Sequence, residues 1–281
     1  MLRKLTYTYS PLKTLRLWHA LLLMPVIILN SCQKVVNIDL NEAFPHIVIE
    51  GLISDSLGPY MVKLTLSGRY FNQPVINPVT GAQVMISDLT AGMTDTLNET
   101  IPGVYLTSKT RGIPGHTYQL MVLSGEKIYS AESTMHAHVP IDSLTIETTD
   151  RFNRRFSDNT KGISCHFMDP ANEKNYYRVK LFVNDSTQAD RYRLYDDQYY
   201  NGEETDIRAG NASPGDYVRV ELISIDKATY DYYRTLSDIL RINPFFGSTP
   251  ANPNTNLSNG ALGYFAAMAI DTRTMLIPLK P

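Results

Sequence analysis

The sequence predicts a mainly β fold, with an N-terminal immunoglobulin-like β-sandwich and a second β-rich domain that carries one α-helix and a long C-terminal loop. Short runs with alternating apolar and polar residues recur between Ile47 and Thr134. Segments rich in Pro and Gly separate these runs and supply turns. One stretch near residues 228–242 changes to helical spacing. Closely spaced short strands of this kind are typical of a sandwich.

Composition narrows the class of protein further. The chain has 281 residues, of which 43% are hydrophobic and 19% charged, and it has two cysteines. These values exclude a disordered chain and a disulfide-rich scaffold, and a single long apolar run excludes a protein with several membrane-spanning helices. The 26 basic and 28 acidic residues nearly balance. We therefore expect no nucleic-acid partner.

Residues 1–31 are predicted to form a lipoprotein signal peptide. They contain four Lys or Arg and no acidic residue, and the apolar run Leu17–Leu29 is shorter than the roughly 20 residues of a membrane-spanning helix. The run leads into Leu29-Asn30-Ser31-Cys32, which resembles the lipobox of bacterial lipoproteins. We predict that Cys32 is lipidated, that residues 32–45 form a tether and that acyl chains anchor the protein to a membrane. The alternative interpretation is an ordinary signal peptide, in which Cys32 has no role.

The first domain is predicted to span residues 46–138. Its alternation is clearest in 60–67, where Tyr60, Val62 and Leu64 share one face. Seven strands are expected, at 47–53, 60–67, 82–88, 93–97, 103–107, 117–123 and 128–133. At its end, His136 and His138 would share one face of a strand and could supply two ligands of a metal site. No carboxylate or cysteine lies beside them in the sequence, so surface histidines of a linker are the preferred interpretation and no metal is expected.

The second domain is predicted to span residues 139–281. Strands are expected at 141–148, 162–168, 175–184, 216–225 and 264–270. The apolar residues of 228–242 recur at helical spacing, with Ser224 or Asp226 available as the N-terminal cap and Asn243-Pro244 as the stop. An acidic, tyrosine-rich insertion at 185–210 and a segment at 243–263 are expected to be loops.

The chain contains no motif of a known catalytic class. It has no Gly-x-Ser-x-Gly, His-Glu-x-x-His, Cys-x-x-Cys or glycine-rich phosphate loop. Cys165 and His166 are adjacent on a predicted strand, where their side chains should point to opposite faces, and Cys165 is expected to be a buried small residue. We therefore predict that the protein is not an enzyme and binds no cofactor.

The acidic insertion partly resembles a calcium loop. Counted from Asp197, the twelfth position should be a glutamate and is Arg208, which excludes an EF-hand. The sequence is compatible with a looser Ca²⁺ site, and a solvated acidic loop is the simpler interpretation. Its acidic residues would be Asp196, Asp197, Glu203, Glu204 and Asp206.

Tyrosines are concentrated in the second domain. Ten of the 18 lie between Tyr176 and Tyr233, and tyrosine presents a large apolar face with a polar tip that suits recognition surfaces. Several of them lie among charged residues in the predicted loop, which is compatible with a partner-binding surface and equally with an ordinary surface. In a competing account, Phe245 packs beneath its loop as part of the core. The predicted partner-binding residues are Arg191, Arg193, Tyr195, Tyr199, Tyr200 and Phe245.

Seven segments together resemble a family of Bacteroidetes outer-membrane lipoproteins defined by domain of unknown function 4249. The segments are Val36–Leu40, Ile47–Gly51, Thr80–Val84, Pro114–Tyr118, Asp169–Pro170 with Asn175–Tyr177, Asn243–Phe245 and Asn256–Phe265. Within the last segment, Asn259–Gly263 departs from the denser glycine pair expected of the family. The resemblance implies an outer-membrane location, often beside a TonB-dependent receptor, and it implies no catalytic residues.

These observations together predict a lipid-anchored, non-catalytic binding or accessory component of the outer membrane, at its periplasmic face or on the cell surface. The expected partner is a TonB-dependent receptor in nutrient uptake, and the sequence does not identify the ligand. The alternative is a structural, adhesion or assembly lipoprotein of the cell envelope.

Overall fold

The computed structural model describes residues 45–68, 77–147, 160–171, 173–187, 192–241 and 252–279. The predicted signal peptide and most of the tether, including Cys32, lie outside these residues. Residues 44–281 form one compact unit. The predicted mainly β fold with one helix is confirmed. Within the described part of the chain, no helix is long and apolar enough to cross a membrane.

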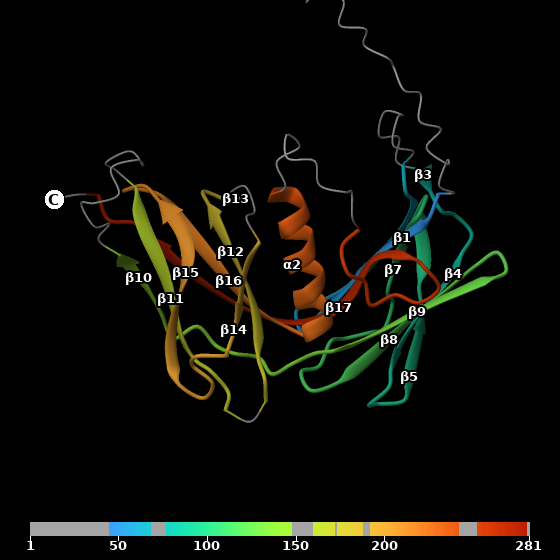
Figure 1. Ribbon diagram of the computed structural model, residues 1–281, viewed down its shortest axis with the longest axis horizontal. Helices are drawn as coiled ribbons and strands as arrows, with labels where there is room; N and C mark the ends of the chain where they lie inside the picture. The colour runs from blue at the N-terminus through green and yellow to red at the C-terminus, as the bar shows by residue number, and fades with distance from the viewer. Residues whose placement is uncertain are drawn as a thin grey trace, which may run out of the picture. The chain divides into compact units, whose positions relative to one another are not determined.

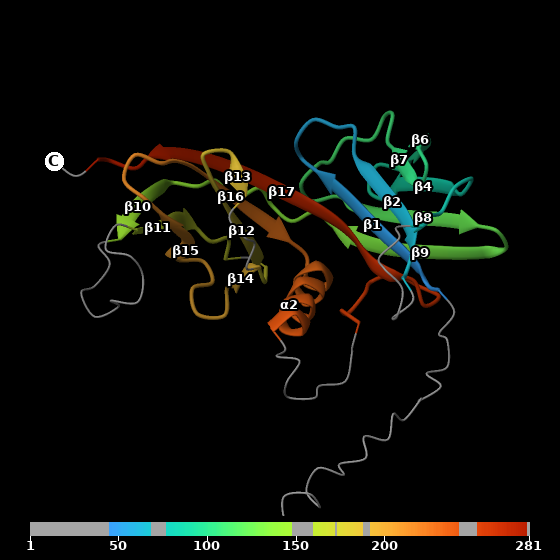
Figure 2. The same cartoon turned by 90° about the horizontal axis from the view of Figure 1, so that it is seen from above.

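One long mixed sheet runs through the compact unit (Figures 1 and 2). Its strands are β1 (Ile47–Ser54), β2 (Met61–Leu66), β3 (Asn77–Pro78), β6 (Asn98–Ile101), β7 (Val104–Leu106), β12 (Tyr176–Val183), β13 (Ser186–Thr187), β14 (Arg193–Asp196), β16 (Tyr217–Ile225) and β17 (Leu262–Leu276). The order across the sheet is β13-β12-β16-β17-β1-β2-β7-β6, with β14 beside β12 and β3 beside β2.

Two smaller sheets complete two hydrophobic cores against this long sheet. The first contains β4 (Gln83–Asp88), β5 (Met93–Thr96), β8 (Thr117–Ser124) and β9 (Lys127–Thr134), in the order β5-β4-β8-β9. The second contains β10 (Ser143–Glu147), β11 (Lys161–Met168) and β15 (Glu204–Ala212), in the order β10-β11-β15. Apolar side chains of the first sheet pack with β1, β2 and β17, and those of the second pack with β12 and β16.

Strand β17 belongs to both sandwiches. Its residues 262–268 pair in parallel with β1, and its residues 269–276 pair antiparallel with β16. Side chains alternate along it: Phe265 and Ala267 enter the first core, whereas Ala266 and Met268 face the cluster beneath the helix. The predicted closing strand therefore continues to Leu276, and the predicted boundary between 46–138 and 139–281 is crossed by this shared sheet. The domain boundaries themselves stay a prediction.

Helix α2 (Lys227–Arg241) confirms the helix predicted near 228–242. Of the two caps considered, Asp226 is the one used, because its Oδ1 accepts a hydrogen bond from the Thr229 N–H at 2.7 Å. The buried face of α2 carries Tyr233, whose hydroxyl donates to the Tyr264 hydroxyl at 2.9 Å. The Arg178 guanidinium lies 4.3 Å from the centre of the Tyr233 ring. The helix is thus held on the long sheet by aromatic packing.

The seven strands predicted in the first half are all present, and β3 and β6 are additional short strands. The loop predicted at 185–210 was wrong, because β13, β14 and most of β15 lie in it. In β15, the charged residues Glu204, Asp206 and Arg208 are exposed, whereas Ile207 and Ala209 enter the second core. A register shift between Ile163 and Ser164 opposite this strand interrupts the alternation that would have identified it.

Candidate functional site

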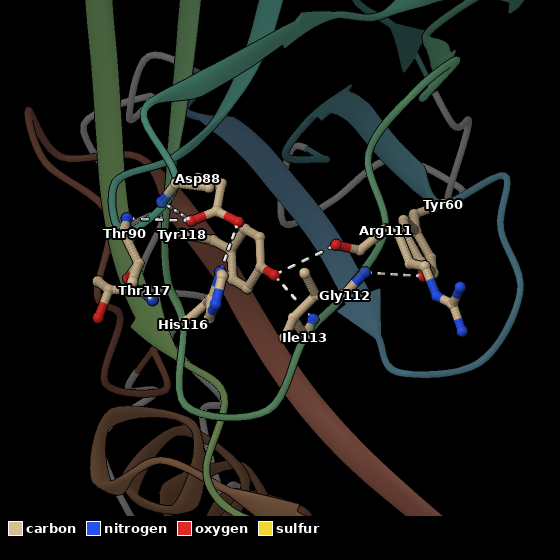
Figure 3. Close-up of polar contacts among 10 residues, drawn as sticks. Tyr60, Asp88, Thr90, Arg111, Gly112, Ile113, His116, Thr117 and Tyr118 are labelled. Atoms are coloured by element: carbon tan, nitrogen blue, oxygen red, sulfur yellow. Dashed lines mark hydrogen bonds and ion pairs between the residues drawn. The ribbon is translucent and has the colours of Figure 1, made fainter.

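Two tyrosine hydroxyls fix the backbone of the connection between β7 and β8 (Figure 3). The Tyr118 hydroxyl accepts a hydrogen bond from the Ile113 N–H at 2.8 Å and donates to the Arg111 carbonyl oxygen at 3.2 Å. The Tyr60 hydroxyl accepts from the Gly112 N–H at 3.1 Å. Burial raises the pKa of Tyr118 to about 12, so its hydroxyl keeps the proton that it donates.

Gly112 lets this segment lie directly against the end of β1. A Cβ atom added at Gly112 would lie 2.0 Å from the Ser54 carbonyl oxygen and 2.5 Å from its carbon. Both are backbone atoms, so a side chain could be accommodated only by moving the segment away from β1. The backbone at this position is therefore fixed by close packing as well as by hydrogen bonds.

Buried aspartates hold both ends of the segment. Before it, the Asp95 carboxylate on β5 accepts five hydrogen bonds from Ser108, Lys109 and Thr110, at 2.7–3.0 Å. Burial acts to raise the pKa of Asp95, but these donors outweigh it and lower the pKa to about 2. At the other end, the Asp88 Oδ2 lies 2.8 Å from the His116 Nδ1 (Figure 3). Residues 108–116 thus have little freedom to move.

This segment forms one wall of an open pocket of about 360 Å³. The residues that line the pocket are Asp55, Arg111, Gly112, Ile113, Pro114 and His138. Arg111 is exposed, and its side chain extends away from Tyr118 in Figure 3. Within the described ranges, its guanidinium forms no hydrogen bond, ion pair or ring contact. The pocket therefore presents one positively charged group whose donors are available to a ligand.

His138 lies between two carboxylates that are far from it in the sequence, Asp55 and Asp271. Its Nδ1 is 2.8 Å from the Asp55 Oδ2, and its Nε2 is 3.4 Å from the Asp271 Oδ1. The second oxygen of Asp55 accepts from the Ile270 N–H at 3.0 Å, and that of Asp271 accepts from the Ile141 N–H at 2.7 Å. The imidazole and both carboxylates therefore join the end of β1, the β9–β10 connection and β17.

His136 and His138 both lie in the connection that follows β9, which agrees with the preferred interpretation of linker histidines and not with the alternative of a shared strand face. His136 pairs with a different carboxylate, at 3.1 Å between its Nδ1 and the Glu173 Oε2. In the part of the chain that the structure describes, no group of three or more His, Cys, Asp or Glu side chains is arranged to hold a metal ion.

The predicted partner-binding residues do not form one exposed patch in the described structure. Arg191 and Phe245 lie outside the described residues, and Arg193 lies on β14. Tyr199 is 86% exposed in the turn that follows β14. The assignment of these residues to partner binding stays a prediction.

The other two tyrosines of the predicted set face the second core. The Tyr195 hydroxyl donates to the Arg208 carbonyl oxygen at 2.7 Å, and burial raises the pKa of Tyr195. The Tyr200 ring packs edge-on against Phe167 with centroids 6.4 Å apart. Both side chains therefore contribute to the packing of β11 and β15, which the sequence pattern did not reveal.

Two buried carboxylates, Asp197 in the acidic insertion and Asp169 outside it, hold two loops together. The Asp197 Oδ2 accepts from the Asn175 N–H at 2.8 Å. On the facing loop, Asp169 accepts from the Tyr177 hydroxyl at 2.5 Å and from the Gly202 N–H at 3.0 Å, and burial raises the pKa of Asp169. These contacts give Asp197 a structural role between the loops 169–175 and 196–203.

Cys165 and His166 are separated as predicted. The Cys165 side chain is fully buried in the second core, where burial raises the pKa of its thiol to about 12. The His166 Nε2 instead lies 2.7 Å from the Thr145 Oγ1 on the other face of the sheet. This geometry gives no basis for nucleophilic chemistry by the pair.

A family model matches most of the chain. The family model described as Domain of unknown function (DUF4249) matches residues 33–274. A search of curated proteins finds no match. The matched segment includes every strand of both sandwiches apart from the last residues of β17, so the chain belongs to the family defined by this domain.

Proposed function

We propose that the protein is a lipid-anchored, non-catalytic binding or accessory component of the outer membrane that works with a TonB-dependent receptor in nutrient uptake. The observation that carries the proposal is the lipobox-like segment ending at Cys32, which precedes a β-rich body with an open pocket. The receptor and the outer-membrane location rest on the family resemblance.

The chemistry of the pocket supports binding over catalysis. Its six lining residues include no hydroxyl, thiol or amine. Asp55 and His138 are the two groups that could act as nucleophiles, and they are paired with each other at 2.8 Å. Both ring nitrogens of His138 face carboxylates, so neither is directed at a ligand as a general base. The Arg111 guanidinium remains available to form hydrogen bonds with a bound molecule.

Lipid anchoring is tested by replacing the proposed acylation site. Cys32→Ala should remove acylation and leave uncleaved precursor in the membrane fraction, because acylation precedes cleavage in this pathway. Metabolic labelling with a palmitate analogue measures the change, and Cys165→Ala is the matched control that should keep its label. Equal labelling of the wild type and Cys32→Ala would contradict the lipoprotein assignment.

The partnership is tested by purifying the tagged full-length protein from its native membrane in mild detergent. A TonB-dependent receptor should be enriched in comparison with an untagged strain. Enrichment of secretion or surface-polymer components without a receptor would instead favour the alternative, a structural, adhesion or assembly lipoprotein of the envelope.

A further inference from the structure

We propose that the pocket lined by Arg111 and His138 binds a singly charged carboxylate that is attached to a small apolar group. This inference rests on the proposed binding function and names the ligand chemistry of its site. The shared chemistry is found in free apolar carboxylic acids and in the C-termini of peptides that end in an apolar residue.

Arg111 supplies the anchor. A guanidinium presents parallel N–H donors that match the two oxygens of a carboxylate, and this pairing is among the strongest hydrogen-bonded contacts in proteins. The Arg111 backbone is held by the Tyr118 hydroxyl, and the next residue is held by the Tyr60 hydroxyl. Because the backbone of the segment is already fixed before a ligand arrives, little backbone conformational entropy is lost on binding.

The neighbouring carboxylates select against ligands with a larger negative charge. Asp55 lines the pocket itself, and Asp271 lies on the other side of the His138 ring. One negative charge near Arg111 is compensated, but a second would be repelled by these carboxylates. We therefore expect a carboxylate to bind better than phosphate.

The remaining wall is apolar and exposed. Ile113 is 42% exposed, and Pro114 beside it is also exposed. A ligand with an apolar group next to its carboxylate would cover both side chains and remove their surface from water. The volume of about 360 Å³ lies at the lower end of the range for small-molecule sites, which suits one amino-acid side chain with its carboxylate.

The test is isothermal titration calorimetry on the full-length protein in detergent. The probe is N-acetyl-leucine, and the comparison ligands are N-acetyl-leucinamide, hexanoate and inorganic phosphate. The uncharged amide and phosphate should each bind at least about tenfold more weakly than the probe. Equal affinity of hexanoate and the probe would indicate a free apolar acid, whereas tighter binding of the probe would indicate a peptide C-terminus.

Matched variants assign the effect to the pocket. Arg111→Gln should weaken binding of N-acetyl-leucine at least about tenfold. Lys109→Gln removes a charge from the same connection at an exposed residue that does not line the pocket, and it should change affinity less than about twofold. If Arg111→Gln has a lowered melting temperature, Arg111→Lys serves as the second variant. This variant keeps the positive charge but loses the parallel N–H donors of the guanidinium, so it should bind N-acetyl-leucine with intermediate affinity.

Undetectable binding of N-acetyl-leucine to the wild type, equal binding of the amide, or unchanged affinity of both Arg111 variants would overturn this inference. Its failure is distinguishable from failure of the proposed function. A receptor that co-purifies with a protein that binds no carboxylate would refute only the ligand assignment. Carboxylate binding without receptor capture would refute only the partnership.

Discussion

Asp95 is the side chain that most directly couples stability to the position of the pocket wall. It is 4% exposed, and its carboxylate accepts from the backbone N–H groups of Ser108, Lys109 and Thr110 at 2.9, 2.7 and 2.9 Å. Asp95→Asn keeps the size of the side chain. The amide loses the charge, however, and it turns an NH₂ group toward N–H donors, so we expect the variant to be less stable.

The magnitude follows from the lowered pKa of Asp95. Burial opposes the shift, but the five donors lower the pKa from 3.8 to about 2. At about 1.4 kcal/mol for each pKa unit, this shift corresponds to about 2 kcal/mol of folding free energy. Because the folded-state pKa is the lower one, this contribution is present in full above pH 4 and is lost as the pH falls towards 2.

Urea denaturation of protein spanning residues 44–281 measures the effect. At pH 7, Asp95→Asn should reduce the free energy of unfolding by about 2 kcal/mol, and the difference from the wild type should shrink between pH 4 and pH 2. Asp238→Asn is the control, because Asp238 is exposed on α2 and its replacement should change stability by less than about 0.5 kcal/mol at any pH. A destabilisation by Asp95→Asn that does not change with pH would refute the reasoning.

Three further predictions follow from packing. Gly112→Ala should destabilise the protein by about 1–3 kcal/mol in thermal or urea melts, because the new Cβ meets the backbone of β1. Gly68→Ala is the control and should be neutral, because its Cβ would have no atom within 4 Å. Equal effects of the two substitutions would contradict the close-packing argument. Burial raises the pKa of the Cys165 thiol to about 12, so Cys165 should resist iodoacetamide until urea unfolds the protein. Mass spectrometry of the labelled peptide measures this reaction, and rapid labelling of the native protein would refute the burial of Cys165. Tyr200→Ala should cost about 1–3 kcal/mol by removing a partly buried ring that packs against the second core. Tyr199→Ala, at an 86% exposed residue, should leave the melting temperature unchanged, and the opposite order would contradict the structure.

Period-two alternation was sufficient to predict seven strands in the first half, because most of them have one buried and one exposed face. In β2, for example, Val62 and Leu64 are fully buried and lie between less buried residues. The short strands β3 and β6 are exposed along their whole length and were missed. The same rule missed β15, where Ala209 and Gly210 carry little apolar signal and the register shifts opposite them. The alternation of apolar and polar residues becomes hard to detect in a strand that contains small residues or a β-bulge.

The pocket could not be predicted because its parts meet only through pairing between distant strands. Asp55 follows β1 and Asp271 lies on β17, and the parallel pairing of these strands brings both carboxylates to His138. Side-chain periodicity reports which face of a strand is buried, but it does not report which strand lies beside it. The role of Arg111 could not be predicted from the sequence either. Its guanidinium is available to a ligand because it forms no hydrogen bond or ion pair within the described residues, and the sequence does not show this.

The sharing of β17 between two sandwiches also has a consequence for how the chain is made. Val48 pairs with Leu262, a separation of 214 residues, so the neighbour that completes the first sandwich is synthesised long after β1 itself. Until then one edge of β1 is open, and such an edge can pair with another polypeptide. Contacts this distant in sequence also slow folding. A truncated chain that ends before Leu262 would therefore lack a finished sandwich at either end, and its exposed edges would make it a substrate for chaperones and proteases of the compartment in which it folds.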